Sequence, residues 1–226
     1  MSKLYIVGTP IGNLGDITYR AIETFKSVDL IAAEDTRHTL RLLTHFEIRK
    51  PLVSCRSQNE SIVALRIIKE MDAGKNVAFA SDAGTPGVSD PGAVLVQMVR
   101  EAGHEVIPIP GASAFATLVS VAGPGGKLVC FAGFLSPKKG RRRSSLRELM
   151  QMEGAIVLYE SPFRIVKLLI DIADIDKERR VVVGRELTKI HEEIVEGTAE
   201  HVRDIFLERQ KILGEFAIFI SANKNA

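Results

Sequence analysis

The chain has 226 residues, which is long enough to bury a hydrophobic core, and its 46% hydrophobic and 26% charged residues are ordinary for a globular protein. This composition excludes an intrinsically disordered chain, a collagen and a long coiled coil. Aromatic residues make up only 6% and Trp is absent, so a platform of stacked aromatic rings is not expected to be the main device for binding nucleic acid.

The first 122 residues alternate between short apolar runs and helical patterns. In the helix expected near 60–72, residues Ile62, Leu65, Ile68 and Met71 predict one apolar stripe. Alternation of this kind is typical of a mostly parallel sheet covered by helices. Strands are predicted at Leu4–Val7, Leu30–Ala33, Leu52–Ser54, Val77–Ala80 and Val106–Ile109, and helices near 18–28, 37–46, 60–72, 92–102 and 113–122.

A run of turn-forming residues at 123–126 predicts a domain boundary, with domains at 1–122 and 123–226. The apolar runs Val181–Val183 and Ile190–Val195 have no helix between them, which predicts an antiparallel pair in a mixed sheet. The fold class is therefore α/β with two α/β domains. In the second domain, further strands are predicted at Val129–Phe131, Ala155–Tyr159 and Phe216–Ile220, and helices near 143–151, 162–173 and 199–210.

Positive charge is concentrated in one segment. The 30 basic and 28 acidic residues give a net charge of +2, but six of the basic residues lie within 138–147, where there is no acidic residue. Such a run is usually a solvated loop. Because the rest of the chain is acidic overall, we favour a mobile cationic flap that neutralises nucleic-acid phosphates.

No metal site, disulfide or membrane segment is expected. Cys55 and Cys130 lie far apart and match no metal or redox spacing, and the segment His191–Glu196 lacks the second His of a zinc-binding helix. No run approaches the roughly 20 apolar residues that span a bilayer, and no signal peptide is recognised. We therefore expect a cytoplasmic protein.

The strongest local signal for a ligand site is Ser81–Gly92, with the sequence SDAGTPGVSDPG, between a buried strand and a helix. Ligands of open α/β sheets bind beyond the carboxyl ends of strands, and Asp82 and Asp90 could accept hydrogen bonds from a ribose hydroxyl or an amine. The alternative is a stiff loop whose Asp side chains cap turns and the next helix.

The loop Gly8–Asp16 follows the first strand but matches neither common phosphate-binding pattern. Pro10 removes a donor, so an uncharged or cationic part of a ligand is easier to accept there than a pyrophosphate. Three further strand ends, at Ala33–Arg37, Pro108–Ala114 and Tyr159–Arg164, carry residues that either bind and catalyse or merely cap helices.

Taken together, Gly8–Thr18, Ala32–Arg37, Ser81–Pro86 with Ser89–Gly92, Tyr159–Pro162 and Arg185–Lys189 resemble the ribosomal RNA small-subunit methyltransferase I family, which belongs to the tetrapyrrole-methylase-like enzymes. The resemblance implies two α/β domains of the tetrapyrrole methylase type with S-adenosyl-L-methionine in the cleft between them. It also implies a homodimer and 2′-O-methylation of a decoding-centre cytidine in 16S rRNA of the small ribosomal subunit.

A base that accepts the proton of the 2′-hydroxyl would assist the transfer, and Asp35, Glu34 and Glu160 are the candidates. The resemblance implies further site residues. The flap residues Lys138, Lys139, Arg141, Arg142 and Arg143 would bind RNA. The cofactor would contact Pro10, Ser81, Asp82, Ala83, Gly84, Val88, Asp90, Ser113, Ala114, Phe134, Leu135, Tyr159, Leu187, Thr188 and Phe216.

The chain departs from the family at the segment Cys55–Glu60 and at Phe163, where members usually carry histidines, and many members continue for a further small C-terminal region. Two alternatives therefore remain. One is a methylase of a corrin or porphyrin with the same fold, and the other is a non-catalytic RNA-binding assembly factor.

Overall fold

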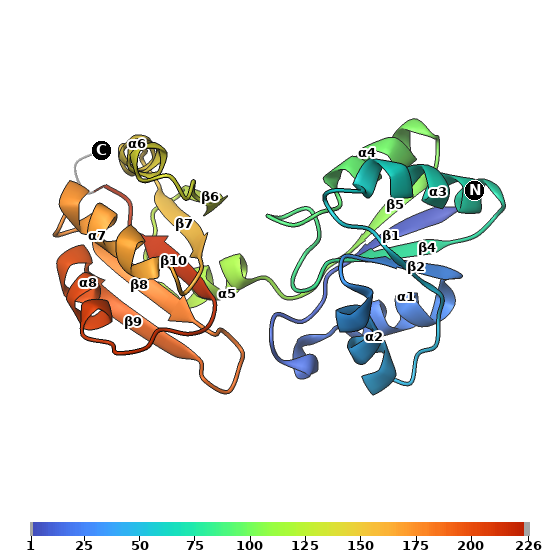
Figure 1. Cartoon of the computed structure of the whole chain (residues 1–226), viewed down its shortest axis with the longest axis horizontal. Helices are drawn as coiled ribbons and strands as arrows, with labels where there is room; N and C mark the ends of the chain where they lie inside the picture. Colours follow the sequence, from blue (N-terminus) through green and yellow to red (C-terminus); the bar gives the residue numbers. More distant parts are fainter. Residues whose placement is uncertain (1, 224–226) are drawn as a thin grey trace. The chain divides into compact units, whose positions relative to one another are not determined.

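The computed structural model describes residues 2–223, and the chain forms two compact units, Met1–Ser113 and Ala114–Ala226 (Figure 1). The sequence placed the boundary nine residues later, at 122. The difference arises because the helix at 114–121 belongs to the second unit, where its Leu118 side chain packs against Gly184.

The first unit contains a five-stranded, wholly parallel sheet in the order β3-β2-β4-β1-β5, as the alternation of strands and helices predicted. Its strands are β1 (Lys3–Val7), β2 (Leu30–Ala33), β3 (Leu52–Ser54), β4 (Val77–Ala80) and β5 (Glu105–Ile109), and its helices are the short 3-10 turn η1 (Leu14–Asp16), α1 (Tyr19–Ser27), α2 (Thr36–His45), α3 (Glu60–Asp72) and α4 (Ala93–Glu101).

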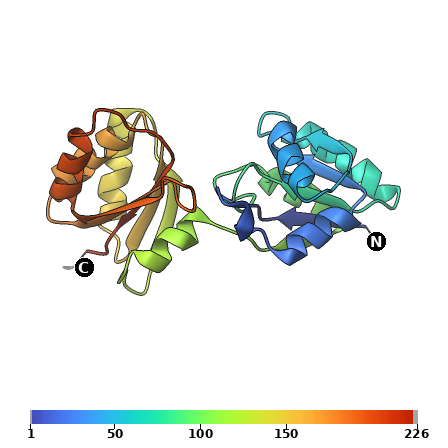
Figure 2. The ribbon, with the colours of Figure 1, turned by 90° about the horizontal axis from the view of Figure 1, so that it is seen from below.

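Helices cover both faces of this sheet (Figures 1 and 2). α3 and α4 bury Ile67 and Leu95 against one face, and α1 and α2 bury Phe25 and Leu43 against the other. β1 leads to α1 and its neighbour β4 leads to α4, so the chain leaves these two adjacent strands toward opposite faces. This is the kind of position at which open α/β sheets bind ligands.

The predicted apolar stripe of α3 is wrong in part. Ile62 and Leu65 are 74% and 62% exposed, whereas Val63, Ala64, Ile67 and Met71 are buried. Steps of three residues turn about 300° each and drift around a helix, so only positions that alternate steps of three and four hold one face. The buried residues Glu60, Ala64, Ile67 and Met71 follow this rule, with steps of four, three and four.

The second unit contains a mixed five-stranded sheet in the order β6-β7-β10-β8-β9, and the predicted antiparallel pair β8–β9 is confirmed. β6 and β7 are parallel, and β10 runs antiparallel to both β7 and β8. Its elements are α5 (Ala114–Val121), β6 (Val129–Phe134), α6 (Lys139–Met150), β7 (Ala155–Glu160), α7 (Ile165–Ile175), β8 (Arg180–Arg185), β9 (Glu193–Thr198), α8 (Ala199–Leu207) and β10 (Phe216–Ile220).

The core of the second unit lies between the sheet and the helices α6, α7 and α8, where Leu146, Leu169 and Phe206 are fully buried. α5 lies on the other side of the sheet (Figure 2). The predicted flap is wrong, because the chain is helical from Lys139 onward rather than from 143. Lys and Arg are good helix formers, and they continue the helix through Gly140.

Candidate functional site

Three loops of the first unit meet at the carboxyl ends of β1, β4 and β5. Thr9 and Gly84 exchange backbone hydrogen bonds of 2.9 and 3.1 Å, and the Gly8 N–H donates to the Ile109 carbonyl at 2.9 Å. A Cβ atom on Gly8 would lie 2.7 Å from the backbone nitrogen of Gly111. The close approach of these loops therefore requires glycine at position 8. The joined loops form a backbone surface at the point where the chain leaves β1 and β4 toward opposite faces.

The loop Ser81–Gly92 is held in a conformation that its sequence specifies. Gly84, Gly87 and Gly92 have φ angles of 75°, 80° and 130°, and Ser89 shares this left-handed region at 67°. Among the predicted cofactor residues, Ser81 and Gly84 are buried, Asp82 is half-buried, and Ala83, Val88 and Asp90 are exposed. The loop thus exposes both polar and apolar side chains at the carboxyl end of β4.

A buried carboxylate that the sequence analysis missed anchors the far end of this loop. Glu60, the first residue of α3, is 6% exposed, and its Oε1 accepts hydrogen bonds of 2.9 Å from the N–H groups of Gly92 and Leu95. It satisfies two N–H groups at the start of α4 that the helix itself leaves unpaired. Burial and the nearby Glu60 raise the pKa of the Cys55 thiol to about 12, so this thiol stays protonated.

Glu34, Asp35 and Asp82 lie together where β2 and β4 end. The Asp35 N–H donates to Asp82 Oδ1 at 2.9 Å, and the Asp82 N–H lies 3.4 Å from Glu34 Oε2. Burial is the main cause that raises the pKa of Glu34; the hydrogen bond from the Asp82 N–H opposes this rise, and the negative charge of the Asp82 carboxylate adds to it more weakly. The Asp35 carboxylate instead caps α2 and pairs with Arg37 at 2.7 Å, which holds its pKa far below the usual range.

Three further predicted cofactor residues lie outside the Ser81–Gly92 loop. Pro10 is buried directly after the Thr9–Gly84 bridge. Ser113 ends the first unit and Ala114 begins α5, and both are half-buried.

In the second unit, an aromatic group lies at the carboxyl ends of β6 and β7. The rings of Phe131 and Phe134 lie 4.9 and 5.7 Å from that of Tyr159, and Phe115 contacts Phe131 at 5.2 Å. The Phe115 N–H donates to the Tyr159 hydroxyl at 2.8 Å, which ties α5 to β7. Phe134 is 56% exposed, whereas Leu135 is buried. This edge of the sheet therefore offers apolar surface to a ligand.

Leu187 and Thr188 follow β8 in a tight turn where Glu186 and Thr188 have φ angles of 50° and 69°. The Thr188 N–H donates to Glu192, but within residues 2–223 its buried Oγ1 has no hydrogen-bond partner. Leu187 is buried against Gly184, where a Cβ atom would lie 2.9 Å from the Leu187 side chain. Phe216 lies at the same end of the sheet, but its ring packs in the core 5.8 Å from Phe206.

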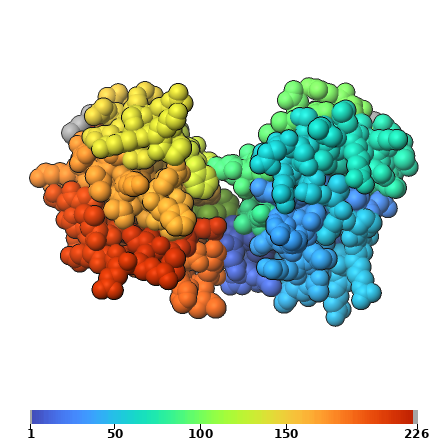
Figure 3. Space-filling view, in the orientation of Figure 1, coloured from blue at the N-terminus to red at the C-terminus, as the bar shows by residue number. Residues whose placement is uncertain are grey.

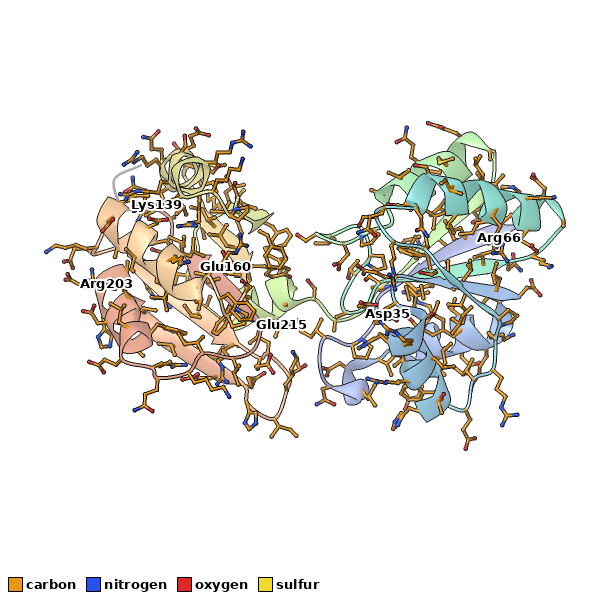
Figure 4. All side chains as sticks on the ribbon, viewed as in Figure 1. Asp35, Arg66, Lys139, Glu160, Arg203 and Glu215 are labelled. Atoms are coloured by element: carbon orange, nitrogen blue, oxygen red, sulfur yellow. The ribbon has the colours of Figure 1, made fainter. Side chains whose placement is uncertain are left out.

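Glu160 ends β7 and is 2% exposed (Figure 4). Its Oε1 accepts hydrogen bonds of 2.7 Å from the Ser161 N–H and from Arg164, and its Oε2 has no partner among the described residues. Arg164 also donates to the Leu135 carbonyl at 3.3 Å. This ion pair therefore connects the ends of β6 and β7, which favours a structural role for Glu160.

The five predicted RNA-binding residues separate into two groups on α6. Arg142 is 3% exposed and pairs with Asp171 of α7 at 2.6 Å, and Arg143 lies 3.3 Å from Asp174. Lys138, Lys139 and Arg141 are exposed, and Figure 4 shows Lys139 at the start of α6. α6, yellow in Figure 3, forms part of the outer surface of the second unit.

No group of three His, Cys, Asp or Glu residues that could hold a metal ion occurs within residues 2–223. None of the helices described there is long and apolar enough to cross a membrane.

Comparisons with known proteins agree with this architecture. The profile of the Tetrapyrrole (Corrin/Porphyrin) Methylases matches residues 3–203. The solved uroporphyrin-III-C-methyltransferase from Thermus thermophilus superposes with a TM-score of 0.68 over 98% of this chain and 94% of that one, at 17% identity, which shows a shared fold.

Two curated relatives are much more similar in sequence, and both are named ribosomal RNA small subunit methyltransferase I. The protein from Borrelia garinii is 44% identical over 98% of this chain and 100% of its own length. The protein from Synechocystis is 46% identical over 98% of this chain and 79% of its own length. The chain therefore belongs to the ribosomal RNA small subunit methyltransferase I family of the tetrapyrrole methylases.

Proposed function

We propose that this methyltransferase transfers the methyl group of S-adenosyl-L-methionine to the ribose 2′-oxygen of a decoding-centre cytidine in 16S rRNA. The observation that carries the proposal is similarity at 44–46% identity, over nearly the whole chain, to proteins named ribosomal RNA small subunit methyltransferase I. The methyl donor follows from membership of the methylase family, and the cytidine 2′-oxygen from the resemblance of the motifs.

The residues present fit this cofactor. S-Adenosyl-L-methionine carries an adenine ring, ribose hydroxyls and an amino-acid group, so its site needs apolar surface beside polar atoms. In the second unit, the half-exposed Phe134 and the ring of Tyr159 supply apolar surface, and the Thr188 hydroxyl lacks a partner among the described residues. In the first unit, Asp82 and the backbone of the Ser81–Gly92 loop supply polar groups.

The cofactor supplies a methyl group on a sulfonium centre, so the chain itself must position the ribose hydroxyl and accept its proton. Glu34 is the best candidate for that base. Its carboxylate forms no ion pair within 4 Å among the described residues, and burial raises its pKa toward the range where a carboxylate accepts protons more readily. Arg37 makes Asp35 a weaker base, and Arg164 already binds Glu160.

Lys138, Lys139 and Arg141 would bind the phosphates of the ribosomal RNA. All three are exposed at the start of α6, and none has an acidic group within 4 Å among residues 2–223. Contacts of this kind position RNA without reading its sequence, and they weaken as salt rises because counterions are released. Arg142 and Arg143 instead form ion pairs with Asp171 and Asp174 of α7, which hold this part of α6 in place.

We also propose, on the family resemblance, that the enzyme acts as a homodimer. Sedimentation equilibrium tests this, and a mass equal to that of one chain at the enzyme concentration used for assay would contradict it.

The experiment that tests the function uses labelled S-adenosyl-L-methionine and small ribosomal subunits from cells that lack this protein. Transfer of label to the 16S rRNA supports the proposal, and transfer only to a corrinoid or porphyrin precursor would replace it with the small-molecule alternative. Calorimetric titration with S-adenosyl-L-methionine accompanies the assay. Cofactor binding and RNA binding without methyl transfer would indicate an assembly factor.

A further inference from the structure

Phe163 is an aromatic side chain that the fold does not use. It is 87% exposed in the turn between β7 and α7. The turn itself is closed by hydrogen bonds, because the N–H groups of Arg164 and Ile165 both donate to the Ser161 carbonyl at 3.1 Å. A hydrogen-bonded turn thus presents a large apolar ring to solvent, where the ring is accessible to a binding partner.

The turn that carries Phe163 is connected to the start of α6. β6 and β7 are parallel neighbours, so the chain leaves both strands at the same edge of the sheet. Arg164, the residue after Phe163, donates to the Leu135 carbonyl at 3.3 Å. The exposed ring and the cationic residues that begin three positions after Leu135 therefore belong to one edge of the second unit.

The charge at this edge is positive and unbalanced. Glu160 neutralises Arg164, and Asp171 and Asp174 neutralise Arg142 and Arg143. Lys138, Lys139 and Arg141 have no such partner among the residues that the structure describes. The nearby Glu148 of α6 accepts a hydrogen bond from Ser144 at 3.3 Å. The three basic side chains without an acidic partner in the described part of the chain therefore favour an anionic partner.

We propose that Phe163 stacks on an unpaired base of the small-subunit ribosomal RNA while Lys138, Lys139 and Arg141 bind the adjoining phosphates. This inference rests on the proposed function and adds a base contact to it. Exposed aromatic rings beside cations bind single-stranded RNA in this way, because every base has a face that can stack, whereas bases inside a duplex are already stacked.

A second copy of the chain is the other candidate for covering Phe163, and the charge argues against it. The centres of protein interfaces are depleted of charged residues, whereas three unpaired cations lie at this edge within the described part of the chain. The single ring is also compatible with an aromatic content of 6%, because one contact requires no platform of rings.

Filter binding of small ribosomal subunits to the enzyme tests the proposal. Phe163→Ala should weaken binding about 10- to 100-fold, which is the effect of removing one base–aromatic stack. Phe163→Tyr should bind like the wild type, and Phe163→Leu should remain weak because it keeps an apolar side chain without a ring. Tyr19→Ala, which removes a ring that is 90% exposed on α1, serves as the matched control and should bind normally.

The dependence of binding on salt separates stacking from charge. Phe163→Ala should leave the salt slope unchanged, whereas Lys138→Ala with Arg141→Ala should reduce it by about one unit for each phosphate that is no longer neutralised. Normal binding by Phe163→Ala, or full rescue by Phe163→Leu, would overturn the inference, and so would a change of oligomeric state in Phe163→Ala. Failure of the wild-type enzyme to methylate the subunits would instead overturn the proposed function.

Discussion

Arg142 of α6 and Asp171 of α7 form a buried ion pair in which the guanidinium Nε and Nη2 lie 2.8 and 2.6 Å from Asp171 Oδ2. The side chains are 4% and 2% exposed. The pair fixes the first turns of α6 against α7, and so it sets which basic residues of this segment face outward. One basic run therefore contains both a buried structural charge and exposed charges, and we propose that the exposed charges bind RNA.

Replacing Arg142 should destabilise the protein, whereas replacing Arg141 should not. Arg142→Ala leaves Asp171 as a buried charge without its main partner, which costs roughly 3–5 kcal/mol in comparable cases. Arg141→Ala removes an exposed side chain and should change the free energy of unfolding by less than about 0.5 kcal/mol while weakening RNA binding. Urea denaturation measures both, and equal stability of the two variants would refute the assignment.

Glu34→Gln should lower the rate of methyl transfer by about 10²- to 10⁴-fold, the usual contribution of a general base. In the wild type, activity should rise with pH as Glu34 loses its proton, at a pKa above the usual carboxyl value, and the variant should lack this rise. The measurement is kcat/KM against pH. A variant that keeps the wild-type rate and profile would exclude Glu34 as the base.

The same pKa shift predicts the stability of that variant. A raised pKa in the folded state means that the protonated form of Glu34 is favoured by folding, and that this contribution is lost as pH rises through the folded pKa. Glu34→Gln mimics the neutral form, so it should be at least as stable as the wild type at pH 7. Thermal unfolding at pH 7 checks this, and it separates impaired catalysis from impaired folding.

Two glycine substitutions should have opposite effects. In Gly8→Ala the new methyl group would lie 2.7 Å from the Gly111 backbone, so the loops after β1 and β5 must separate. We expect lower stability and at least 10-fold weaker binding of S-adenosyl-L-methionine, because the site geometry is disturbed. Gly140 has open space around it within α6, and Gly140→Ala should stabilise the protein by up to about 1 kcal/mol.

Calorimetry and thermal unfolding measure the two glycine variants side by side. Normal cofactor binding by Gly8→Ala would show that the surface where the loops after β1, β4 and β5 meet is not part of the cofactor site.

Glu60→Ala should loosen the Ser81–Gly92 loop. It leaves the N–H groups of Gly92 and Leu95 without their acceptor, at a cost of about 1–3 kcal/mol, and should weaken cofactor binding. Glu60→Gln retains an oxygen at the same distance from the backbone and should recover much of both. If Ala and Gln variants bound the cofactor equally well, the hydrogen bonds of Glu60 would not position the loop.

Much of the fold could be predicted because local patterns decide it. The buried runs Leu30–Ala33 and Val77–Ala80 are strands as expected, and the short connection between β8 and β9 correctly predicted an antiparallel pair. The Gly and Pro residues that follow the strand Val77–Ala80 predicted Ser81–Gly92 as a loop at a strand end, and the structure shows that this strand is the neighbour of β1.

The rest depends on contacts between distant residues. Asp171 lies 29 residues after Arg142, and Gly92 lies 32 residues after Glu60, so neither pairing has a local signal. The position of Glu60 at the start of α3 is equally typical of an exposed acidic residue that stabilises a helix. For the same reason, sequence could not separate Glu34 from Asp35, because only the folded chain shows that Arg37 binds one and burial affects the other.

The central claim is tested most directly by identifying the methylated nucleoside. Small ribosomal subunits from cells lacking this protein are incubated with the enzyme and S-adenosyl-L-methionine, and the 16S rRNA is digested and analysed by mass spectrometry. The account predicts one new 2′-O-methylcytidine, at a decoding-centre position. A methyl group on a base, on another nucleoside, or on no RNA at all would contradict it.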